Sequence, residues 1–335
     1  MATSADNGVD NGAGLRVVFM GTPEFAVPAL DALLQVGCEI TGVYTKPDRR
    51  SGRGRRLTAP PVKQAAIERG LSVFQPASLR RDAEARAQLA ALQPDVIVVV
   101  AYGLFLPADT LAVPPLGALN LHPSLLPKYR GPSPVASAIL NGDTTTGVTL
   151  MRLDEGMDSG PIIAQRDTQI GAEETTADLT PRLFKIGAQL LAECLPQCRD
   201  GAANAMPQRE ADATITRLLT REDGAIDWTN SADHIARQVR AYHPWPGSFT
   251  RWNGRQLKVH QATAIGIGAF EELGDESFER QEPGEVVENP QGIAVVCGDD
   301  LLLLLRLQIE GRQATDIDDF VRGYRDFPGS RLGST

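Results

Sequence analysis

Apolar positions divide the chain into two regions with different patterns. Up to about Cys198, short runs rich in Val and Ile alternate with segments whose apolar residues recur every three or four positions. This alternation predicts β-α-β units with right-handed crossovers, and so a Rossmann-like, open, parallel-rich sheet with helices on both faces. We expect strands at 15–20, 39–45, 72–74, 95–101, 118–121, 146–153 and 161–167, and helices at 23–35, 62–69, 80–92, 132–140 and 175–198.

The run from Asp95 to Ala101 marks the centre of the predicted sheet. It is rich in β-branched residues throughout, which is typical of a strand buried on both faces. Tyr102 and Gly103 follow its C-terminal end, where open α/β sheets bind their ligands. The turn after the first strand, Gly21 to Phe25, lacks the Gly-x-Gly-x-x-Gly fingerprint, and no acid caps the second strand. A dinucleotide site, and with it a nicotinamide-dependent oxidoreductase, is therefore disfavoured.

The second region follows a stretch without clear periodicity, which we interpret as a linker at 201–220. A helix at 232–241 precedes short strands at 248–252, 256–264, 284–287, 292–296 and 301–309. Five short strands separated by turns fit a small β-barrel. The predicted organisation is a disordered tail at 1–14, a first domain at 15–200 and a second domain at 221–333. We expect Trp228 and Trp245 in a domain core or interface.

Composition is that of an ordinary globular protein, with 42% apolar and 22% charged residues. No apolar run approaches the roughly 20 residues of a membrane span. The first fourteen residues contain no Lys or Arg and so do not resemble a signal or transit peptide. We therefore expect a cytoplasmic protein. Cys194 and Cys198 share a predicted helix face but lack partners at zinc-site spacing, so we expect reduced thiols and no metal.

The net charge of −9 argues against a nucleic-acid partner, but the charges are unevenly distributed. Between Lys46 and Lys63 basic residues are dense and Asp48 is the one acid. The segment 234–270 also contains Arg and Lys but no Asp or Glu. Two basic patches on an acidic body suit a phosphate-bearing ligand that binds at defined places.

The candidate chemistry lies between Asn120 and Gly160. Side chains alternate along a strand, so Asn120 and His122 should lie on one side of the strand predicted around them. Asp158 follows in a turn between Gly156 and Gly160. We expect the fold to bring Asn120, His122 and Asp158 into one pocket.

Together these groups suit acyl transfer. An imidazole exchanges protons near neutral pH, and a carboxylate beside it stabilises its charged form. An amide can donate to the oxygen that becomes negative when a carbonyl carbon turns tetrahedral. The set has no obvious nucleophile, which favours direct transfer to an amine or water. Residue types alone leave open that the histidine is structural and that the aspartate only forms a turn.

The complete motif is more specific. Asn120-Leu-His122-Pro-Ser-Leu-Leu-Pro127, followed by Asp154-x-Gly-x-Asp158-Ser-Gly160, resembles the folate-dependent formyltransferase family. Val18-Phe-Met-Gly21-Thr-Pro-Glu-Phe25, Thr45-Lys-Pro-Asp48-Arg, Arg221-Glu-Asp223-Gly-x-Ile-Asp227-Trp228 and Tyr242-His-Pro-Trp245-Pro extend the likeness over about residues 15 to 333.

The resemblance implies transfer of the formyl group of 10-formyltetrahydrofolate, without a metal, to the amino group of initiator methionyl-tRNA. It gives the catalytic roles to Asn120, His122 and Asp158, and it implies an OB-like barrel for the second domain. It places the folate along Ser124, Leu125, Leu126 and Pro127. The small and apolar groups around Tyr102 and Gly103 could accept its flat pterin ring.

Contacts to tRNA are expected in both basic patches. Arg53 matches the loop arginine with which the family engages the tRNA acceptor end. Its neighbours Arg49, Arg55 and Arg56 lie in the same loop, predicted irregular from Lys46 to Pro61, which could order on RNA. On the helix at 232–241, Arg237 and Arg240 could face either the tRNA backbone or solvent.

Two departures from the family pattern and three alternatives remain. Pro123 has no backbone N–H, which excludes a folate contact through that amide. Ile215-Thr-Arg217-Leu replaces the Tyr-Ala-x-Lys that the family often has. A glycinamide-ribonucleotide or a sugar-nucleotide formyltransferase would share the catalytic centre, and an RNA-binding protein with an inactive first domain is the third reading. We expect a monomer, because no exposed apolar stripe suggests otherwise.

Overall fold

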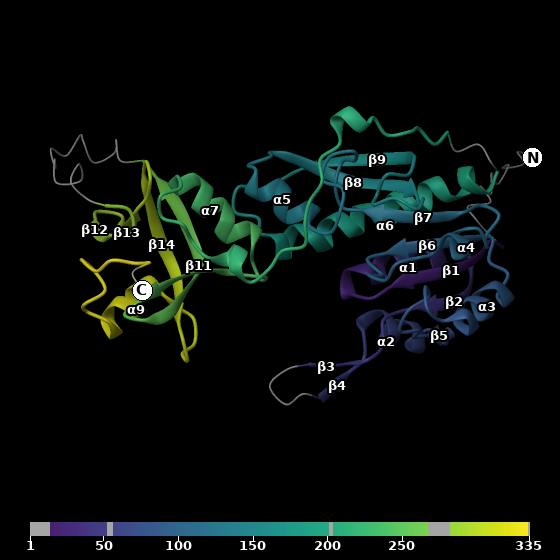
Figure 1. Ribbon diagram of the computed structural model, residues 1–335, viewed down its shortest axis with the longest axis horizontal. Coiled ribbons are helices and arrows are strands. Elements are labelled where there is room, and N and C mark those ends of the chain that lie inside the picture. Colours follow the sequence, from purple (N-terminus) through teal and green to yellow (C-terminus); the bar gives the residue numbers. More distant parts are fainter. Residues whose placement is uncertain (1–13, 52–55, 201–203, 267–281, 334–335) are drawn as a thin grey trace, which may run out of the picture. The chain divides into compact units, whose positions relative to one another are not determined.

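The computed structural model describes residues 14–51, 56–200, 204–266 and 282–333 (Figure 1). The chain divides into two compact units. The N-terminal unit comprises the chain up to Gly131 together with Thr145–Gln169 and Thr180–Thr216. The C-terminal unit comprises Pro132–Thr144, Ile170–Leu179 and the chain from Arg217 onward. The tail predicted at 1–14 lies, apart from Gly14, outside the described residues.

The N-terminal unit is built on a seven-stranded sheet with the order β5-β2-β1-β6-β7-β8-β9. The first five strands in this order run parallel, whereas β8 and β9 are antiparallel to their neighbours. The predicted parallel-rich sheet is therefore confirmed. Its strands are β1 (Arg16–Gly21), β2 (Glu39–Tyr44), β5 (Val73–Phe74), β6 (Val96–Val100), β7 (Ala118–His122), β8 (Thr145–Arg152) and β9 (Ile162–Gln169).

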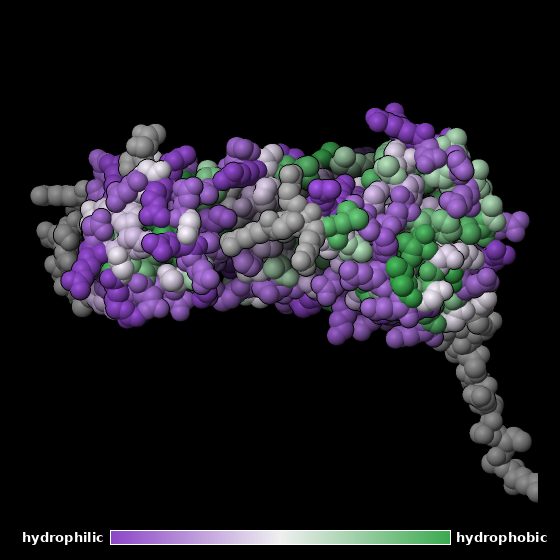
Figure 2. Space-filling view, turned by 90° about the horizontal axis from the view of Figure 1, so that it is seen from below, coloured by the Kyte–Doolittle hydropathy of each residue, from purple (hydrophilic) through white to green (hydrophobic). Residues whose placement is uncertain are grey.

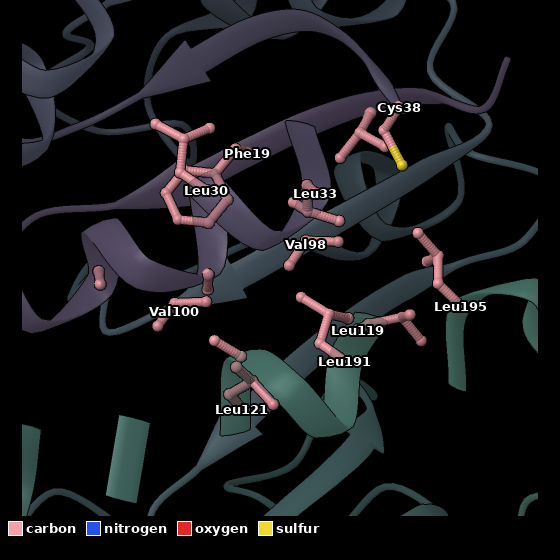
Figure 3. Packing of buried hydrophobic residues seen from close by; sticks show 14 of the residues in the cluster. Phe19, Leu30, Leu33, Cys38, Val98, Val100, Leu119, Leu121, Leu191 and Leu195 are labelled. Carbon is pink, nitrogen blue, oxygen red and sulfur yellow. The ribbon is translucent and has the colours of Figure 1, made fainter. Parts of the chain in front are cut away.

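Helices cover both faces of this sheet, because successive side chains of its strands point to opposite faces and are apolar on each. In β1, Val17 and Phe19 pack with helices α1 and α6, and Figure 3 shows Phe19, Leu30 and Leu191 in this cluster. The intervening Val18 and Met20 pack with α3 on the opposite face. The helices with residues in this unit are α1 (Val27–Gln35, after the 3-10 turn Glu24–Ala26), α2 (Pro61–Glu68), α3 (Ala83–Ala91), α4 (Ala108–Leu111) and α6 (Thr176–Arg199).

The segment from Lys46 to Pro61 is not wholly irregular, and that prediction was wrong. Strands β3 (Arg49–Ser51) and β4 (Arg56–Thr58) pair antiparallel, with Arg49 opposite Thr58. Backbone hydrogen bonds make this pair without an apolar face, so the side-chain pattern carried no signal for it. At its base, the Asp48 carboxylate accepts hydrogen bonds from Lys63 Nζ and Gln75 Nε2, both at 2.8 Å.

The C-terminal unit contains an antiparallel sheet with the order β10-β11-β14-β13-β12, and β15 pairs with β14. Among the described strands no pair joins β10 to β12, so these strands do not close into the predicted barrel by hydrogen bonds. Hydrophilic residues dominate the face of this unit seen in Figure 2. Its elements are α5 (Pro134–Leu140), 3-10 turn Glu222–Gly224, α7 (Ala232–Ala241), β10 (Ser248–Trp252), β11 (Arg255–Ile265), β12 (Val286–Asn289), β13 (Gly292–Val296), β14 (Leu301–Ile309), β15 (Thr315–Asp316) and α9 (Ile317–Gly323).

The tryptophans of this unit differ in burial. Trp228 is 5% exposed, as predicted, and donates its indole N–H to Thr250 Oγ1. Trp252 is buried against the aromatic rings of Phe320 and Phe327. Trp245 is 58% exposed, so it does not lie in a domain core, and its other predicted place, a domain interface, stays a prediction. Residue type shows that a tryptophan is large and apolar, but it does not show whether its side chain points into the core or toward solvent.

None of the four cysteines forms a disulfide, and all are buried. Within the described residues no group of His, Cys, Asp and Glu is arranged to hold a metal ion. No described helix is both long and apolar enough to cross a membrane.

Candidate active site

Strand β7 presents the first two candidate catalytic residues. Asn120 pairs in register with Val99 of β6 and Met151 of β8, and His122 lies opposite Thr149 of β8. Since the strand extends to His122, alternation puts both side chains on one face, as predicted. Asn120 is half-buried, and its side-chain amide makes no hydrogen bond within the described part of the chain. It is therefore available to a ligand.

The two ring nitrogens of His122 have different surroundings. Nε2 lies 2.9 Å from the Tyr129 carbonyl oxygen, which can only accept, so Nε2 carries a hydrogen and donates it. Nδ1 lies 3.5 Å from Asp158 Oδ2. The ring is only 4% exposed, and this burial lowers its pKa below the usual 6.5, against the opposing effects of Asp158 and the Tyr129 carbonyl. The imidazole is therefore neutral near pH 7, with the lone pair of Nδ1 toward Asp158.

Asp158 is held in place through its backbone and its carboxylate. Its φ of 50° is in the left-handed region, which aspartate tolerates better than most residues. Oδ2 accepts a hydrogen bond of 2.8 Å from the Gly131 N–H. The 3.5 Å to His122 Nδ1 exceeds an ordinary N–H···O bond. Two proton-accepting atoms thus face each other, an arrangement that favours a proton or an N–H group between them.

Glycines and an aspartate shape the loop that carries Asp158. Asp154 Oδ1 accepts hydrogen bonds of 3.0 Å from the Gly156 N–H and from Ser159 Oγ. A Cβ at Gly160 would lie 2.0 Å from the Arg152 carbonyl oxygen, so only glycine fits there. The Asp-x-Gly-x-Asp-Ser-Gly spacing therefore has a local structural cause besides any chemical one.

The predicted folate residues after His122 form a tightly bonded turn. Ser124 is fully buried, and its Oγ donates to the Lys128 carbonyl at 2.7 Å. Leu126 is buried; its N–H donates to Thr149 Oγ1, and its carbonyl oxygen accepts from Gln165 Nε2. Leu125 and Pro127 are partly exposed and present the apolar surface of the turn.

Tyr102 and Gly103 occupy the C-terminal edge of β6, as predicted, but the tyrosine points inward. Its ring is 1% exposed among core residues, and its hydroxyl has no partner within the described chain. Gly103 has φ of 72°, and a Cβ there would lie 2.3 Å from Lys46 Nζ. Burial, and then nearby Arg49, lower the pKa of Lys46. Lys46 is a cation at this edge that the sequence did not single out, because it stands among many other basic residues.

The predicted tRNA-binding arginines fall into three groups. Arg49 is exposed on β3. Arg53 and Arg55 lie outside the described residues, and for Arg56 only the backbone is described. Arg237 Nε donates to the Leu140 carbonyl at 3.0 Å, and an Arg240 guanidinium N–H donates to the Glu174 carbonyl at 3.2 Å. The last two are partly buried and bond within the C-terminal unit, so each has a structural partner already.

These features identify a class of protein. Residues 15–195 match the family described as "Formyl transferase", and residues 218–325 match the family described as "Formyl transferase, C-terminal domain". The chain belongs to the formyltransferase family.

Curated relatives carry a more particular name. A methionyl-tRNA formyltransferase from Roseiflexus sp. (strain RS-1) is 49% identical over 320 residues, which are 95% of each chain. A methionyl-tRNA formyltransferase from Chloroflexus aggregans is 54% identical over 301 residues, or 89% of this chain and 94% of the relative.

Solved structures share the fold at lower identity. A sugar 3N-formyl transferase, WlaRD, superimposes with a TM-score of 0.61 at 16% identity, over 90% of this chain and all of its own. HypX from Aquifex aeolicus in complex with tetrahydrofolic acid gives a TM-score of 0.59 at 16% identity, over 92% of this chain and 47% of HypX.

Proposed function

We propose that this protein transfers the formyl group of 10-formyltetrahydrofolate to the amino group of initiator methionyl-tRNA, giving formylmethionyl-tRNA for translation initiation. The similarity of nearly the whole chain to methionyl-tRNA formyltransferases supports the acceptor. The observation that carries the chemistry is the position of His122 Nδ1, which lies 3.5 Å from the Asp158 carboxylate on the face that also presents the Asn120 amide.

The proposed reaction uses Nδ1 of His122 for the proton. The unprotonated amine attacks the formyl carbon, and the new C–N bond places a positive charge on the amine. Nδ1 takes one amine proton, and Asp158 stabilises the imidazolium that forms. The same proton then passes to N10 of the folate as its bond to the formyl carbon breaks, which regenerates the neutral ring.

Asn120 is proposed to stabilise the oxyanion. Its side-chain NH2 donates to the formyl oxygen as that oxygen becomes negative. Loss of one such donor typically costs about 3 to 4 kcal/mol of transition-state stabilisation. His122 contributes to the same charge only after Nδ1 is protonated, because its Nε2–H is already bonded to Tyr129.

The folate is proposed to lie between the turn at Ser124–Pro127 and the edge at Gly103. The exposed parts of Leu125 and Pro127 would contact its apolar surface, and the Lys46 ammonium lies where a side chain at Gly103 would be. With the Tyr102 ring in the core, any contact from that residue comes from its backbone. Lys46 is placed to attract an anionic group of the donor.

The tRNA contacts are proposed mainly for the β3–β4 hairpin, the antiparallel pair Arg49–Ser51 and Arg56–Thr58. Arg49 and Arg50 are exposed there, and Arg53, Arg55 and Arg56 belong to the same segment of the sequence. Arg237 and Arg240 are weaker candidates, because both guanidinium groups donate to carbonyls of their own unit. We propose that the protein acts as a monomer in the cytoplasm, where the charged tRNA is made.

An assay with 10-formyltetrahydrofolate and charged initiator tRNA tests the proposal, with acid-gel separation of formylmethionyl-tRNA from methionyl-tRNA. Asn120→Ala or His122→Ala should each lower turnover by at least about two orders of magnitude. Circular dichroism should show the fold intact. Near-full activity in either variant would reject the assignment of that residue.

A sugar-nucleotide formyltransferase is the second candidate, since solved enzymes of that kind share the fold. The same assay with a dTDP-linked amino sugar, or with glycinamide ribonucleotide, distinguishes the acceptors. Formylation of either in preference to methionyl-tRNA would overturn the proposed acceptor and leave the catalytic residues unaffected.

A further inference from the structure

The segment from Gln208 to Thr216 supports both loops of the candidate active site. Gln208 Nε2 donates to the Asp158 carbonyl at 2.8 Å and to the Gly160 carbonyl at 2.7 Å. Its Oε1 accepts from Arg130 Nε at 2.9 Å. One amide therefore joins the loop that carries Asp158 to the loop that follows His122. Gln208 is 50 residues away from Asp158 and 78 from Arg130 in the chain.

The segment from Gln208 to Thr216 also holds the Tyr129 carbonyl, which orients the His122 ring. The Tyr129 N–H donates to Thr214 Oγ1 at 2.7 Å, and the Arg130 N–H donates to the Thr214 carbonyl at 2.8 Å. The Thr216 N–H then donates to the Arg130 carbonyl at 2.7 Å. These bonds hold the peptide whose Tyr129 oxygen accepts from His122 Nε2. The Gly131 N–H that binds Asp158 is the next donor along this backbone.

We propose that Gln208 is a positioning residue for formyl transfer, which keeps the Asp158 carboxylate at His122 Nδ1 by holding the backbone of the Asp158 loop. The inference rests on the proposed function for its kinetic consequence but not for its structural one. The left-handed φ of 50° at Asp158 is a conformation that needs support from its surroundings. Gln208 supplies that support at the carbonyl of Asp158 itself.

Two substitutions separate this role from general packing. Gln208→Ala removes all three hydrogen bonds. Gln208→Glu keeps an acceptor for Arg130 and adds a charge that favours it, but it places an oxygen against the carbonyls of Asp158 and Gly160. If the two hydrogen bonds to the Asp158 loop matter, Gln208→Glu should lower kcat as much as Gln208→Ala does. If only the support of Arg130 matters, Glu is tolerated.

Arg209→Ala is the matched control. Arg209 is the next residue in the same segment, and its side chain is 81% exposed, with one ion pair of 3.3 Å to Asp212. The three variants would be compared with the unaltered protein for kcat and KM in the formylation assay, for thermal stability, and for the titration of His122 followed by NMR.

We expect both Gln208 variants to lower kcat about 10- to 100-fold with KM for the folate changed less than about threefold, as for a displaced catalytic group. The titration midpoint of His122 should fall, because burial lowers the pKa of the ring and a displaced Asp158 carboxylate would oppose that effect less. Activity in Gln208→Glu close to that of Arg209→Ala would overturn the inference. So would an unchanged His122 titration in both Gln208 variants. If the unaltered protein formylates no acceptor, the proposed function fails, while the His122 titration still decides the role of Gln208.

Discussion

The two ring nitrogens of His122 have different partners: the Tyr129 carbonyl lies at Nε2 and the Asp158 carboxylate at Nδ1. The Tyr129 carbonyl keeps the hydrogen on Nε2, and Nδ1 is left as the ring atom that can exchange a proton with a substrate. Burial keeps the ring neutral, and Asp158 makes its charged form accessible once a proton arrives. These contacts support the proposed proton relay through a single nitrogen of the ring.

The tautomer and the pKa of His122 can be measured directly. Because burial outweighs the carboxylate, we expect the ring to stay neutral, with hydrogen on Nε2, at pH 6.5, and to gain its second proton only below that pH. Long-range ¹H–¹⁵N NMR spectra of the imidazole rings would show this, and His122→Asn would assign the signal among the four histidines.

The folded protein thus binds this proton less readily than the unfolded chain does. Stability contributed by His122 should therefore decline as pH falls from 6.5 toward the lower pKa of the folded state. A ring that is already protonated at pH 7, or that carries its hydrogen on Nδ1, would contradict the relay.

The pairing of His122 with Asp158 was predictable from the sequence, but its supports were not. Strand alternation and the glycines around Asp158 indicated where the side chains would go. The Tyr129 carbonyl could not be picked out from the sequence, because every residue has a backbone carbonyl. Gln208 stands in a polar stretch interpreted as linker, and nothing local marks it as a partner of a loop 50 residues earlier.

At the scale of elements, the loop after β7 depends on one glycine. Gly131 has φ of 99°, and a Cβ there would lie 2.7 Å from the Thr216 carbonyl oxygen. Its N–H is also the donor to Asp158. Gly131 thus has two roles: it allows the close approach to Thr216, and its N–H binds the Asp158 carboxylate.

Gly131→Ala should therefore reduce both stability and turnover. Gly117→Ala is the matched control, because Gly117 has a similar φ of 80° with nothing within 4 Å of an added Cβ. We expect Gly117→Ala to cost about 1 to 2 kcal/mol in urea unfolding and to leave kcat unchanged. Gly131→Ala should cost more than the control and lower kcat at least about tenfold. Equal effects of the two substitutions would show that the contact with Thr216 is unimportant.

Packing of α9 onto the C-terminal sheet depends on Trp252. Its ring meets Phe327 edge-on, with centroids 5.2 Å apart, and Phe320 at 6.1 Å. We expect Trp252→Ala to lower the free energy of unfolding of this unit by about 3 to 5 kcal/mol. Trp245→Ala, at a residue 58% exposed, should change it by less than about 1 kcal/mol. Chemical denaturation followed by circular dichroism measures both, and similar losses would argue against this packing.

Long periodic elements were predicted well, and the elements that were missed are all short. Helix α7 was predicted at its observed bounds, since Ser231 caps it by accepting the His234 N–H and the apolar spacing is clear. The hairpin β3–β4, the helices α4 and α9 and the strand β15 were not predicted. Each has seven or fewer residues, and so offers little periodicity in the sequence, while contacts elsewhere in the fold stabilise it.

At the scale of the whole molecule, the negative net charge of the protein is unfavourable for binding the proposed tRNA substrate. The protein has a net charge of −9, yet the proposed acceptor is a polyanion. Binding must then depend on local cations, such as the exposed hairpin residues Arg49 and Arg50. The net negative charge of the protein would oppose binding in other orientations.

Arg49→Ala and Arg50→Ala should raise KM for methionyl-tRNA about three- to tenfold each, leaving KM for the folate unchanged. They should also reduce the dependence of KM on salt concentration, because fewer counterions are released from the tRNA. Arg81→Ala removes an equal charge from another exposed position and serves as control. Equal effects of all three substitutions would mean that total charge, and not the hairpin, governs binding.

The buried thiols make the two units separately observable. Burial raises the pKa of Cys38 and Cys198 to about 11 in the N-terminal unit, and that of Cys297 to about 12 in the C-terminal unit. An alkylating reagent reacts with thiolates, so it can modify these sites only while the surrounding structure is open. Mass spectrometry after timed alkylation would therefore record how often each unit opens, without any engineered probe, and would show whether bound folate or tRNA slows one of them or both.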